Sequence, residues 1–491
     1  MRTSGILLHI TSLPGPEGIG TLGREAYRFV DFLKASGMSV WQVLPISPTG
    51  YGESPYQSFS TYAGNPLLID LETLYKEGLL KEAPAQAEPC AKVDYPAIMA
   101  HKQAQLEKAF ASADEKTLRE AEAFTQANAH WLKDYALFMA LKKHFGGGSW
   151  MQWPDEGIRR RNTEALKRYG ELLQKEAAFH SFVQYLFSRQ WQALRRYANE
   201  KGIRIFGDMP IYVALDSSDC WAHPEVFQLD RDLVPKAVAG VPPDYFSRDG
   251  QLWGNPLYNW KALRKTGYGW WIDRLRAMGG YYDMIRVDHF IGFANYYAVP
   301  WGASTARNGC WRRGPGRHFF EKVRRELPGL NIIAEDLGAV NHRVRLLLRC
   351  CGYPGMKVLC FGFSGGDDNP HRLSHVRRHC VAYTGTHDND TLLGWWNKAD
   401  SEEKENARRL LNMKKGDDIT DHLIRALYDS PAMLAVLPMQ DILRLDGSAR
   451  MNLPGTLGGN WAWRMLPDAM KDELAENLSK FNREYRRENK A

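Results

Sequence analysis

Long apolar runs are absent from this sequence. No stretch of its 491 residues approaches the roughly 18 consecutive apolar side chains of a membrane-spanning helix, and the apolar run at 6–10 is too short for a signal peptide. A strong charge of either sign is also missing, because 64 basic residues nearly balance 57 acidic ones. The local basic excess at 480–490 is typical of a solvated helix end. We therefore expect no membrane contact and no nucleic-acid partner.

Cysteine is scarce and scattered. The seven cysteines form no C-x-x-C pair, which argues against a disulfide framework and against a structural zinc site. No H-E-x-x-H pattern occurs, and no H-x-x-x-H pattern includes His289 or His387. We therefore expect free thiols in a reducing compartment, the cytoplasm, and no bound metal.

Aromatic residues, in contrast, are abundant. The chain holds 16 Trp, 22 Tyr and 20 Phe. A large core rich in big side chains explains such a composition, and so does a stacking platform for sugars or bases. Composition alone leaves both interpretations open.

Short β-like runs alternate with helix-like stretches along the chain. This alternation predicts a parallel sheet covered by helices. Eight such units fit a (β/α)8 TIM barrel, an α/β fold, and a doubly wound sheet is the alternative. The predicted strands are 5–11, 40–46, 203–210, 284–290, 331–337, 356–363, 381–386 and 435–443.

The spacing of these strands is uneven. About 155 residues separate the second from the third, several times the length of one βα unit. We expect one barrel spanning 1–491, with a largely helical insertion at approximately 60–180 after strand 2. A second insertion, a long aromatic-rich loop, is expected at approximately 213–281 after strand 3. Amphipathic patterns predict barrel helices at 24–36 and 178–199, which Gly37 and Gly202 end.

Acidic side chains follow three of the predicted strands. Asp288, Glu335 and Asp388 each come at the carboxyl end of an apolar run. In a barrel these ends meet at one mouth, where the chemistry of such enzymes is placed. Arg286 is two residues before Asp288 and points the same way, so it keeps that carboxylate ionised. Partial burial of Glu335 is expected to raise its pKa towards that of a general acid.

Two carboxyl groups in different environments are what retaining glycoside chemistry needs. One attacks the anomeric carbon and the other protonates the leaving oxygen, while Asp388 stabilises the transition state. His387 and His289 lie beside these acids and offer hydrogen bonds to hydroxyl groups. Capping, salt bridges or metal binding are the alternatives for each acid alone. A fourth acid, Asp208, ends the third strand and is either a substrate contact or a salt-bridge partner.

Several long motifs carry a family resemblance across residues 5–464. The motifs are YGESPYQS at 51–58, AGNPLLI at 63–69, GDMPIYV at 207–213, GVPPDYF at 240–246, LWGNP at 252–256, RVDHF at 286–290, AEDLG at 334–338, THDN at 386–389, RMNLPGT at 450–456 and NW at 460–461. With these motifs the sequence resembles the amylomaltases, the disproportionating 4-α-glucanotransferases of glycoside hydrolase family 77.

The resemblance implies a role for each matched residue. Asp288 matches the nucleophile, Glu335 the general acid and base, and Asp388 the transition-state stabiliser. The other matched residues contact substrate: Arg286, His387, Asp208, Tyr56, Trp253, Asn460, and Tyr245 and Phe246 in a loop over the cleft. The family fold is a barrel with helical insertions and no C-terminal β-sandwich domain, and it needs no cofactor.

The implied activity is transfer of an α-1,4-glucan segment to the 4-hydroxyl of an acceptor glucose or glucan, through a covalent glycosyl-aspartate. Maltooligosaccharides and glucose are the expected partners, and the expected assembly is a monomer or weak homo-oligomer. Three other functions stay open from the residues alone: an α-1,4-glucan hydrolase, a non-catalytic glucan-binding protein and a metal-dependent sugar isomerase. Aromatic faces that hold an acceptor would favour transfer over hydrolysis.

Overall fold

Eight parallel strands form the centre of the molecule in a computed structural model, which describes residues 2–243 and 247–488. Each apolar run predicted from the sequence overlaps one of them. The strands are β1 (Thr3–Leu7), β2 (Val40–Gln42), β3 (Arg204–Met209), β6 (Met284–Val287), β9 (Ile332–Ala334), β10 (Gly355–Val358), β11 (Cys380–Tyr383) and β12 (Leu434–Pro438).

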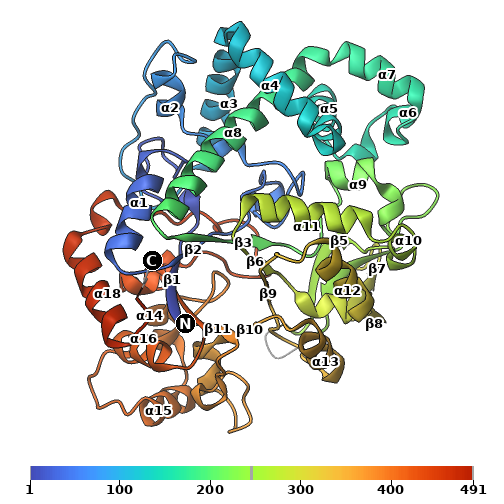
Figure 1. The fold of residues 1–491 in the computed structure, drawn as a ribbon. Helices are drawn as coiled ribbons and strands as arrows, with labels where there is room; N and C mark the ends of the chain where they lie inside the picture. Colours follow the sequence, from blue (N-terminus) through green and yellow to red (C-terminus); the bar gives the residue numbers. More distant parts are fainter. Residues whose placement is uncertain (1, 244–246, 489–491) are drawn as a thin grey trace.

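The strands follow one another around a nearly closed barrel (Figure 1). Their hydrogen-bonded order is β10-β11-β12-β1-β2-β3-β6-β9, and every pair is parallel. The remaining gap is bridged where the amide of Ala334 donates to the carbonyl of Pro354, at 2.9 Å. Inside the barrel the Tyr383 hydroxyl donates to Gln42 at 3.0 Å, across two intervening strands. The predicted (β/α)8 architecture is therefore confirmed.

Helices on the outside connect successive strands. Both predicted barrel helices are present, and each is followed by a glycine with positive φ, Gly37 at 70° and Gly202 at 77°, which only glycine adopts without strain. The unit between β10 and β11 is the exception, with only the 3-10 turns Leu359–Phe363 and Leu373–His375. The outer helices are α1 (Arg24–Ala35), α8 (Gln174–Glu200), α11 (Gly269–Tyr281), α12 (Arg317–Glu326), α13 (His342–Cys351), α14 (Leu392–Lys398), α15 (Ser401–Leu410), α16 (Ile419–Asp429), α17 (Met439–Ile442) and α18 (Asp472–Glu484).

A helical layer lies over one side of the barrel, at the top of Figure 1. It is built from the residues between β2 and β3 and packs on α8, whose predicted apolar stripe is buried. Its helices are α2 (Leu71–Lys76), α3 (Tyr95–Ser112), α4 (Glu115–Ala127), α5 (Ala129–His144), α6 (Glu156–Arg159) and α7 (Thr163–Leu172).

One buried ion pair anchors this layer to the barrel. The Lys102 ammonium of α3 contacts the Glu17 carboxylate, and both side chains are 2% exposed. Lys102 also donates to the carbonyl of Ile69 at 2.6 Å, and Glu17 accepts from the amide of Leu71 at 2.9 Å. Both charges are therefore satisfied only while the layer is docked.

We expect Lys102→Met to lower the free energy of unfolding by about 3–5 kcal/mol, because it leaves the Glu17 carboxylate buried without a partner. Equilibrium urea unfolding measures the loss. Lys108→Met, at an exposed site on the same helix, is the matched control and should change little. The double variant Lys102→Met with Glu17→Leu should recover most of the loss. A Lys102→Met loss no larger than the control's contradicts the anchoring role.

Residues 213–281, expected as a long aromatic-rich loop, are largely ordered secondary structure. They contain α9 (Ser218–Ala222), β4 (Ala237–Val241), β5 (Gln251–Pro256), α10 (Trp260–Lys265) and the barrel helix α11. Strands β4 and β5 join β7 (Asn295–Pro300) and β8 (Cys310–Arg313) in an antiparallel sheet of order β5-β4-β7-β8. Glycines inside β4 and β5 and the full exposure of β8 weaken the strand pattern in the sequence.

The segment before α1 has the spacing G-x-G-x-x-G at 18–23, which in doubly wound sheets cradles a pyrophosphate. Here the Asp70 carboxylate occupies that place. A Cβ on Gly23 would lie 1.9 Å from it, and the Thr21 hydroxyl donates to it at 2.8 Å. The glycine thus makes room for Asp70, which caps α2 through the amide of Thr73 at 2.7 Å. A negative charge therefore stands where an anion would have to bind.

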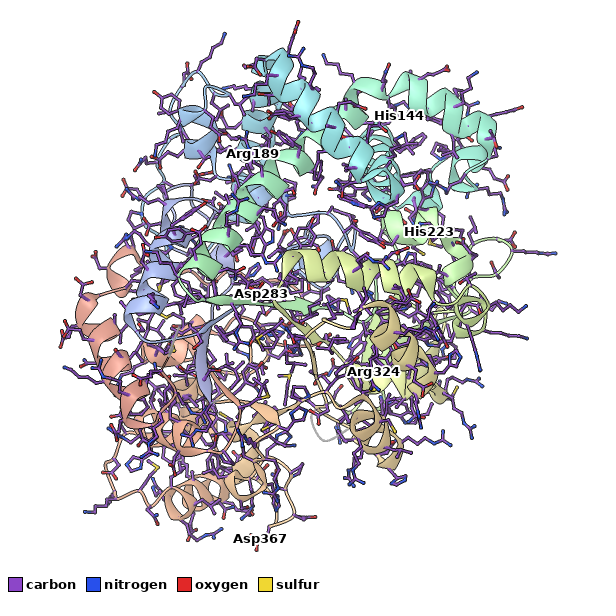
Figure 2. All side chains as sticks on the ribbon, viewed as in Figure 1. His144, Arg189, His223, Asp283, Arg324 and Asp367 are labelled. Atoms are coloured by element: carbon purple, nitrogen blue, oxygen red, sulfur yellow. The ribbon has the colours of Figure 1, made fainter. Side chains whose placement is uncertain are left out.

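Structural contacts occupy the amino-terminal end of the barrel. Asp283, labelled in Figure 2, precedes β6 and pairs with Arg195 of α8 at 2.7 Å. The Arg487 guanidinium donates to the carbonyls of Thr3 and Tyr428, so the carboxyl-terminal segment lies against β1.

No strand follows β12 in the described part of the chain. No helix within the described ranges combines the length and apolar character that crossing a membrane requires.

Candidate active site

Arg286 is the centre of a charged cluster at the carboxyl ends of the strands. It lies on β6 directly opposite Asp208 of β3. Its guanidinium contacts Asp208 at 2.6 Å and Asp288 at 2.8 Å. The expected proximity of Arg286 and Asp288 is thus confirmed. Asp208 is fully buried, whereas the Asp288 side chain is 27% exposed and open to a ligand.

Tyr56 and His387 extend this cluster across the barrel mouth. The Tyr56 hydroxyl donates to Asp208 at 2.8 Å and lies 2.9 Å from Nε2 of His387. Because a hydroxyl has one hydrogen, Nε2 of His387 must carry the proton that it shares with Tyr56. Burial, and next the charge of Asp208, hold the pKa of Tyr56 well above its usual value, so the hydroxyl stays protonated. The two rings stack with centroids 5.3 Å apart.

Glu335 follows β9 and is buried beside this cluster. Burial, its largest influence, raises the pKa of Glu335 to about 8; Arg286 opposes that rise and Asp288 adds to it. The backbone amide of Leu337 donates to its carboxyl group at 3.0 Å. Glu335 therefore holds a proton at neutral pH, as the sequence led us to expect, while Asp288 is paired with a guanidinium. The site offers one acid and one carboxylate.

Asp388 lies in the loop after β11, with its side chain 43% exposed. Nε2 of His387 is 3.4 Å from Oδ1 of Asp388, and the Asn452 amide donates to the same oxygen at 2.7 Å. Arg450 donates to the Asp388 carbonyl at 2.6 Å. Sequence reasoning gave neither Asn452 nor Arg450 a role, although the motif that contains both was singled out.

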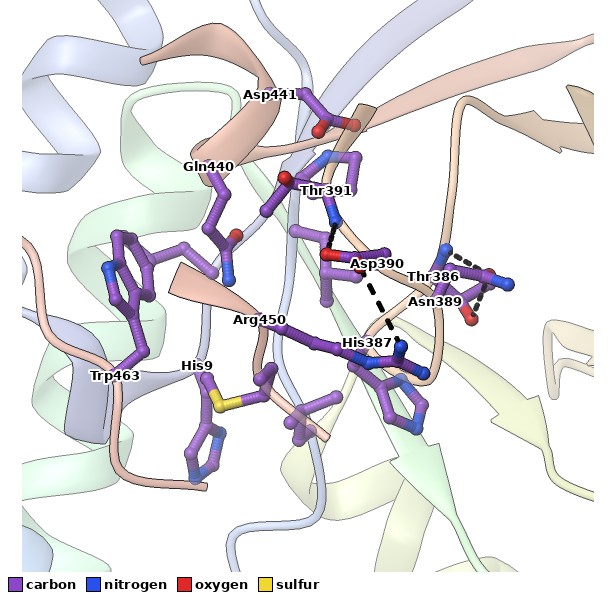
Figure 3. A pocket seen from close by; sticks show the side chains of 15 residues that line it. His9, Thr386, His387, Asn389, Asp390, Thr391, Gln440, Asp441, Arg450 and Trp463 are labelled. Carbon is purple, nitrogen blue, oxygen red and sulfur yellow. Dashed lines mark hydrogen bonds and ion pairs between the residues drawn. The ribbon is translucent and has the colours of Figure 1, made fainter. Parts of the chain in front are cut away.

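A cavity of about 20 Å³, room for one water molecule, lies behind His387. It is lined by the ends of β1 and β12 and by the loop that follows β11, and Figure 3 shows His387 and Arg450 among its lining residues, with Asp390 close to Arg450. His9 also lines it. Burial, and next the charge of His387, lower the pKa of His9 to about 3, so this histidine is neutral.

Trp253 reaches the cluster from the second sheet. Its ring meets His289 edge to face, with centroids 4.8 Å apart. His289 follows Asp288 directly and is buried, which lowers its pKa to about 4. A half-buried indole thus packs on the neutral imidazole that follows Asp288.

Asn460, the remaining predicted residue within the described ranges, makes its hydrogen bonds outside this cluster. Asn460 accepts from the amide of Leu453 at 3.0 Å and donates to Thr456, so it shapes its own loop. The neighbouring Trp461, which sequence reasoning left without a role, packs on Tyr56 at 5.7 Å and on His387 at 6.0 Å. Tyr245 and Phe246 lie outside the described residues.

Comparison with known proteins shows the family of the chain. The profile of glycoside hydrolase family 77, described as 4-alpha-glucanotransferase, matches residues 8–469. A 4-alpha-glucanotransferase of Synechocystis is 47% identical over 99% of this chain and 98% of its own. One from Thermus thermophilus is 47% identical over 97% of both. The structure of amylomaltase from Streptococcus agalactiae in complex with acarbose superposes with a TM-score of 0.96, at 41% identity over 100% of both chains. The chain therefore belongs to the 4-alpha-glucanotransferases of family 77 and is an enzyme of the amylomaltase type.

Proposed function

We propose that this enzyme moves segments of α-1,4-glucans to the 4-hydroxyl of glucose or of another glucan by retaining double displacement. The observation that carries the proposal is the difference in protonation between two carboxyl groups of the site, one ionised and one protonated. Asp288 is paired with Arg286 at 2.8 Å, and the pKa of buried Glu335 is raised to about 8. A nucleophilic carboxylate and a protonated acid are the two groups that this mechanism requires.

In the first step a carboxylate oxygen of Asp288 attacks the anomeric carbon of the donor. The glycosidic bond breaks as Glu335 gives its proton to the leaving oxygen, and the departing sugar leaves with a new 4-hydroxyl. The donor segment stays attached to Asp288 as a glycosyl ester. Loss of the proton makes Glu335 the base for the second step.

In the second step Glu335 removes the proton of an acceptor 4-hydroxyl. The oxygen attacks the anomeric carbon, the ester bond breaks, and Asp288 returns to its carboxylate form. Two inversions leave the α configuration unchanged. Asp388 accepts hydrogen bonds from the reacting sugar. The cluster of Asp208, Tyr56 and His387 binds its hydroxyls.

Transfer rather than hydrolysis requires a bound acceptor. Trp253 presents a half-buried ring next to His289 and supports this proposal, because an acceptor stacked there reaches a high effective concentration. Tyr245 and Phe246 are proposed to guide the glucan chain, and Asn460 to contact it. The S. agalactiae structure is a complex with acarbose, and we propose that acarbose binds here too.

Incubation with maltotriose tests the proposal. We expect glucose and a ladder of longer maltodextrins, with total reducing ends constant, because each transfer breaks one glycosidic bond and forms another. Chromatography resolves the products while a reducing-end titration follows the total. Glucose and maltose with rising reducing ends would mean hydrolysis. No products despite measurable acarbose binding would mean a binding protein.

We also propose that the enzyme works in the cytoplasm. All seven cysteines are free thiols, and Cys90 and Cys310 are exposed. Exposed unpaired thiols suit a reducing compartment.

A further inference from the structure

Two side chains of one loop hold the same acid at two points. The amide of Asn452 fixes Oδ1 of Asp388 at 2.7 Å, and Arg450 fixes the Asp388 main-chain carbonyl at 2.6 Å. Asn452 and Asp388 are 64 residues apart in the chain, so the barrel fold brings them together. A side chain held at its carboxylate and at its own backbone loses the rotation about its Cα–Cβ bond.

Arg450 also determines where Asn452 stands. Its Nε donates to the main-chain carbonyl of Asn452 at 2.7 Å, and its Nη1 lies 4.0 Å from the Asp390 carboxylate. The contacts form a closed ring, from the Asp388 carboxylate through Asn452 to the Arg450 guanidinium and back to the Asp388 carbonyl. Figure 3 shows the Arg450 guanidinium close to Asp390.

One carboxylate oxygen of Asp388, Oδ2, takes no part in this ring of contacts. Both close partners of the side chain, Asn452 and His387, contact Oδ1. No hydrogen bond or ion pair to Oδ2 occurs in the described part of the chain, and the side chain is 43% exposed. Oδ2 is therefore the oxygen presented to a ligand. Its direction is set by the hydrogen bond at Oδ1.

We propose that Asn452 and Arg450 are positioning residues, which hold the Asp388 carboxylate so that Oδ2 faces the hydroxyls of the reacting sugar. The inference rests on the proposed function, in which Asp388 stabilises the transition state. Misplacing a group that acts in the transition state lowers kcat more than it raises KM. Displacements near 1 Å cost on the order of 10²-fold in rate.

The sharpest test is Asn452→Asp. The introduced carboxyl group stands at the same distance from Asp388 as the amide it replaces. It can donate a hydrogen bond to Asp388, as the amide does, only while it is protonated, that is, while the two carboxyl groups share one proton. As pH rises and that proton is lost, the two negative charges repel each other. The titratable or charged groups around Asp388 include His387, Tyr56, Arg450 and, beside Arg450, Asp390. These groups are the same in the variant and in wild type, so the ratio of variant to wild-type kcat at each pH removes their influence.

We expect the ratio of variant to wild-type kcat on maltotriose to rise as pH falls, from about 10⁻² at pH 8 to within about tenfold of wild type at pH 5. Asn452→Ala should lower kcat by about 10–100-fold at every pH, with KM changed less than about threefold. Arg450→Lys keeps the charge but cannot reach both carbonyls, so kcat should fall about tenfold. The control is Asn406→Ala on α15, which removes a side-chain amide that donates to the main-chain carbonyl of Phe363.

Two outcomes overturn the inference. One is an Asn452→Asp ratio that does not change with pH, which a general loss of folding would produce. The other is an Asn452→Ala variant with wild-type kcat. Thermal unfolding of each variant separates loss of folding from loss of position. Asp388→Asn is assayed alongside. If it retains wild-type turnover, the proposed role of Asp388 fails, whereas an inactive Asp388→Asn with unaffected Asn452 variants refutes only the positioning.

Discussion

Asp288→Asn is expected to lower kcat for maltotriose transfer by at least about 10⁴-fold, because the amide cannot form the glycosyl ester on which both steps depend. The fold should tolerate the change. Arg286 is 4% exposed but keeps its contact with Asp208 at 2.6 Å, so no buried charge is left without a partner. Asparagine also has nearly the shape of aspartate. Acarbose affinity, measured by calorimetry, should therefore stay within about tenfold of wild type.

The control for this variant is Asp273→Asn, which removes a carboxylate of an exposed pair with Arg276 on α11. It should keep full activity. A fluorinated glycosyl fluoride that forms the ester but releases it slowly should add its sugar mass to the peptide that contains Asp288. Turnover of Asp288→Asn near the wild-type rate, or a label on another residue, would show that the nucleophile lies elsewhere.

Much of the barrel was predictable because its strands are buried on both faces. Runs such as 332–334 and 434–438 are apolar without interruption, and polar residues follow them, Glu335 directly after the first and Gln440 two residues after the second. The second sheet was not predicted. Its strand β8 is exposed at all four residues, and glycines interrupt β4 and β5, so these strands show no regular alternation of buried and exposed side chains in the sequence.

The acids of the site were predictable for a topological reason. Parallel strands bring their carboxyl ends to one mouth, so Asp208 and Arg286 become neighbours whatever the loops do. Asn452 and Arg450 could not be placed in this way. They lie in a loop beyond the last strand, and their contact with Asp388 depends on the path of that loop back across the mouth. Trp461 reaches Tyr56 by the same path.

Glu335→Gln is expected to lower kcat on maltotriose by about 10²–10⁴-fold, the usual contribution of a general acid and base. An α-maltosyl fluoride should be affected far less in the first step, because fluoride leaves without a proton. The ester then accumulates, since no base activates the acceptor. Azide, which needs no base, should restore turnover and give a glycosyl azide of retained configuration. Equal losses in the rate of the first step on both substrates, measured as release of the leaving group in a single turnover, would contradict the acid role.

The same substitution should also change the pH dependence of activity. Wild-type Glu335 has a pKa raised to about 8 by burial, so in the free enzyme the acid form needed for the first step is lost as pH rises through about 8. The alkaline limb of kcat/KM on maltotriose should follow that loss. With α-maltosyl fluoride as substrate the alkaline fall in kcat/KM should be absent even in wild type, because the leaving fluoride needs no proton. A limb that persists with the fluoride would belong to another group.

Stability gives an independent measure of the same carboxyl group. Its pKa is raised in the folded protein from an ordinary value of 4.5 to about 8, so between these values the folded state holds a proton that the unfolded state releases. The contribution of Glu335 to the free energy of unfolding of wild type therefore falls as pH rises from about 4.5 to about 8. Glutamine does not titrate. The free energy of unfolding of Glu335→Gln, relative to that of wild type, should therefore rise across this pH range, by up to about 5 kcal/mol above pH 8. A difference that stays constant with pH would show that Glu335 has an ordinary pKa and is not the acid poised for the first step.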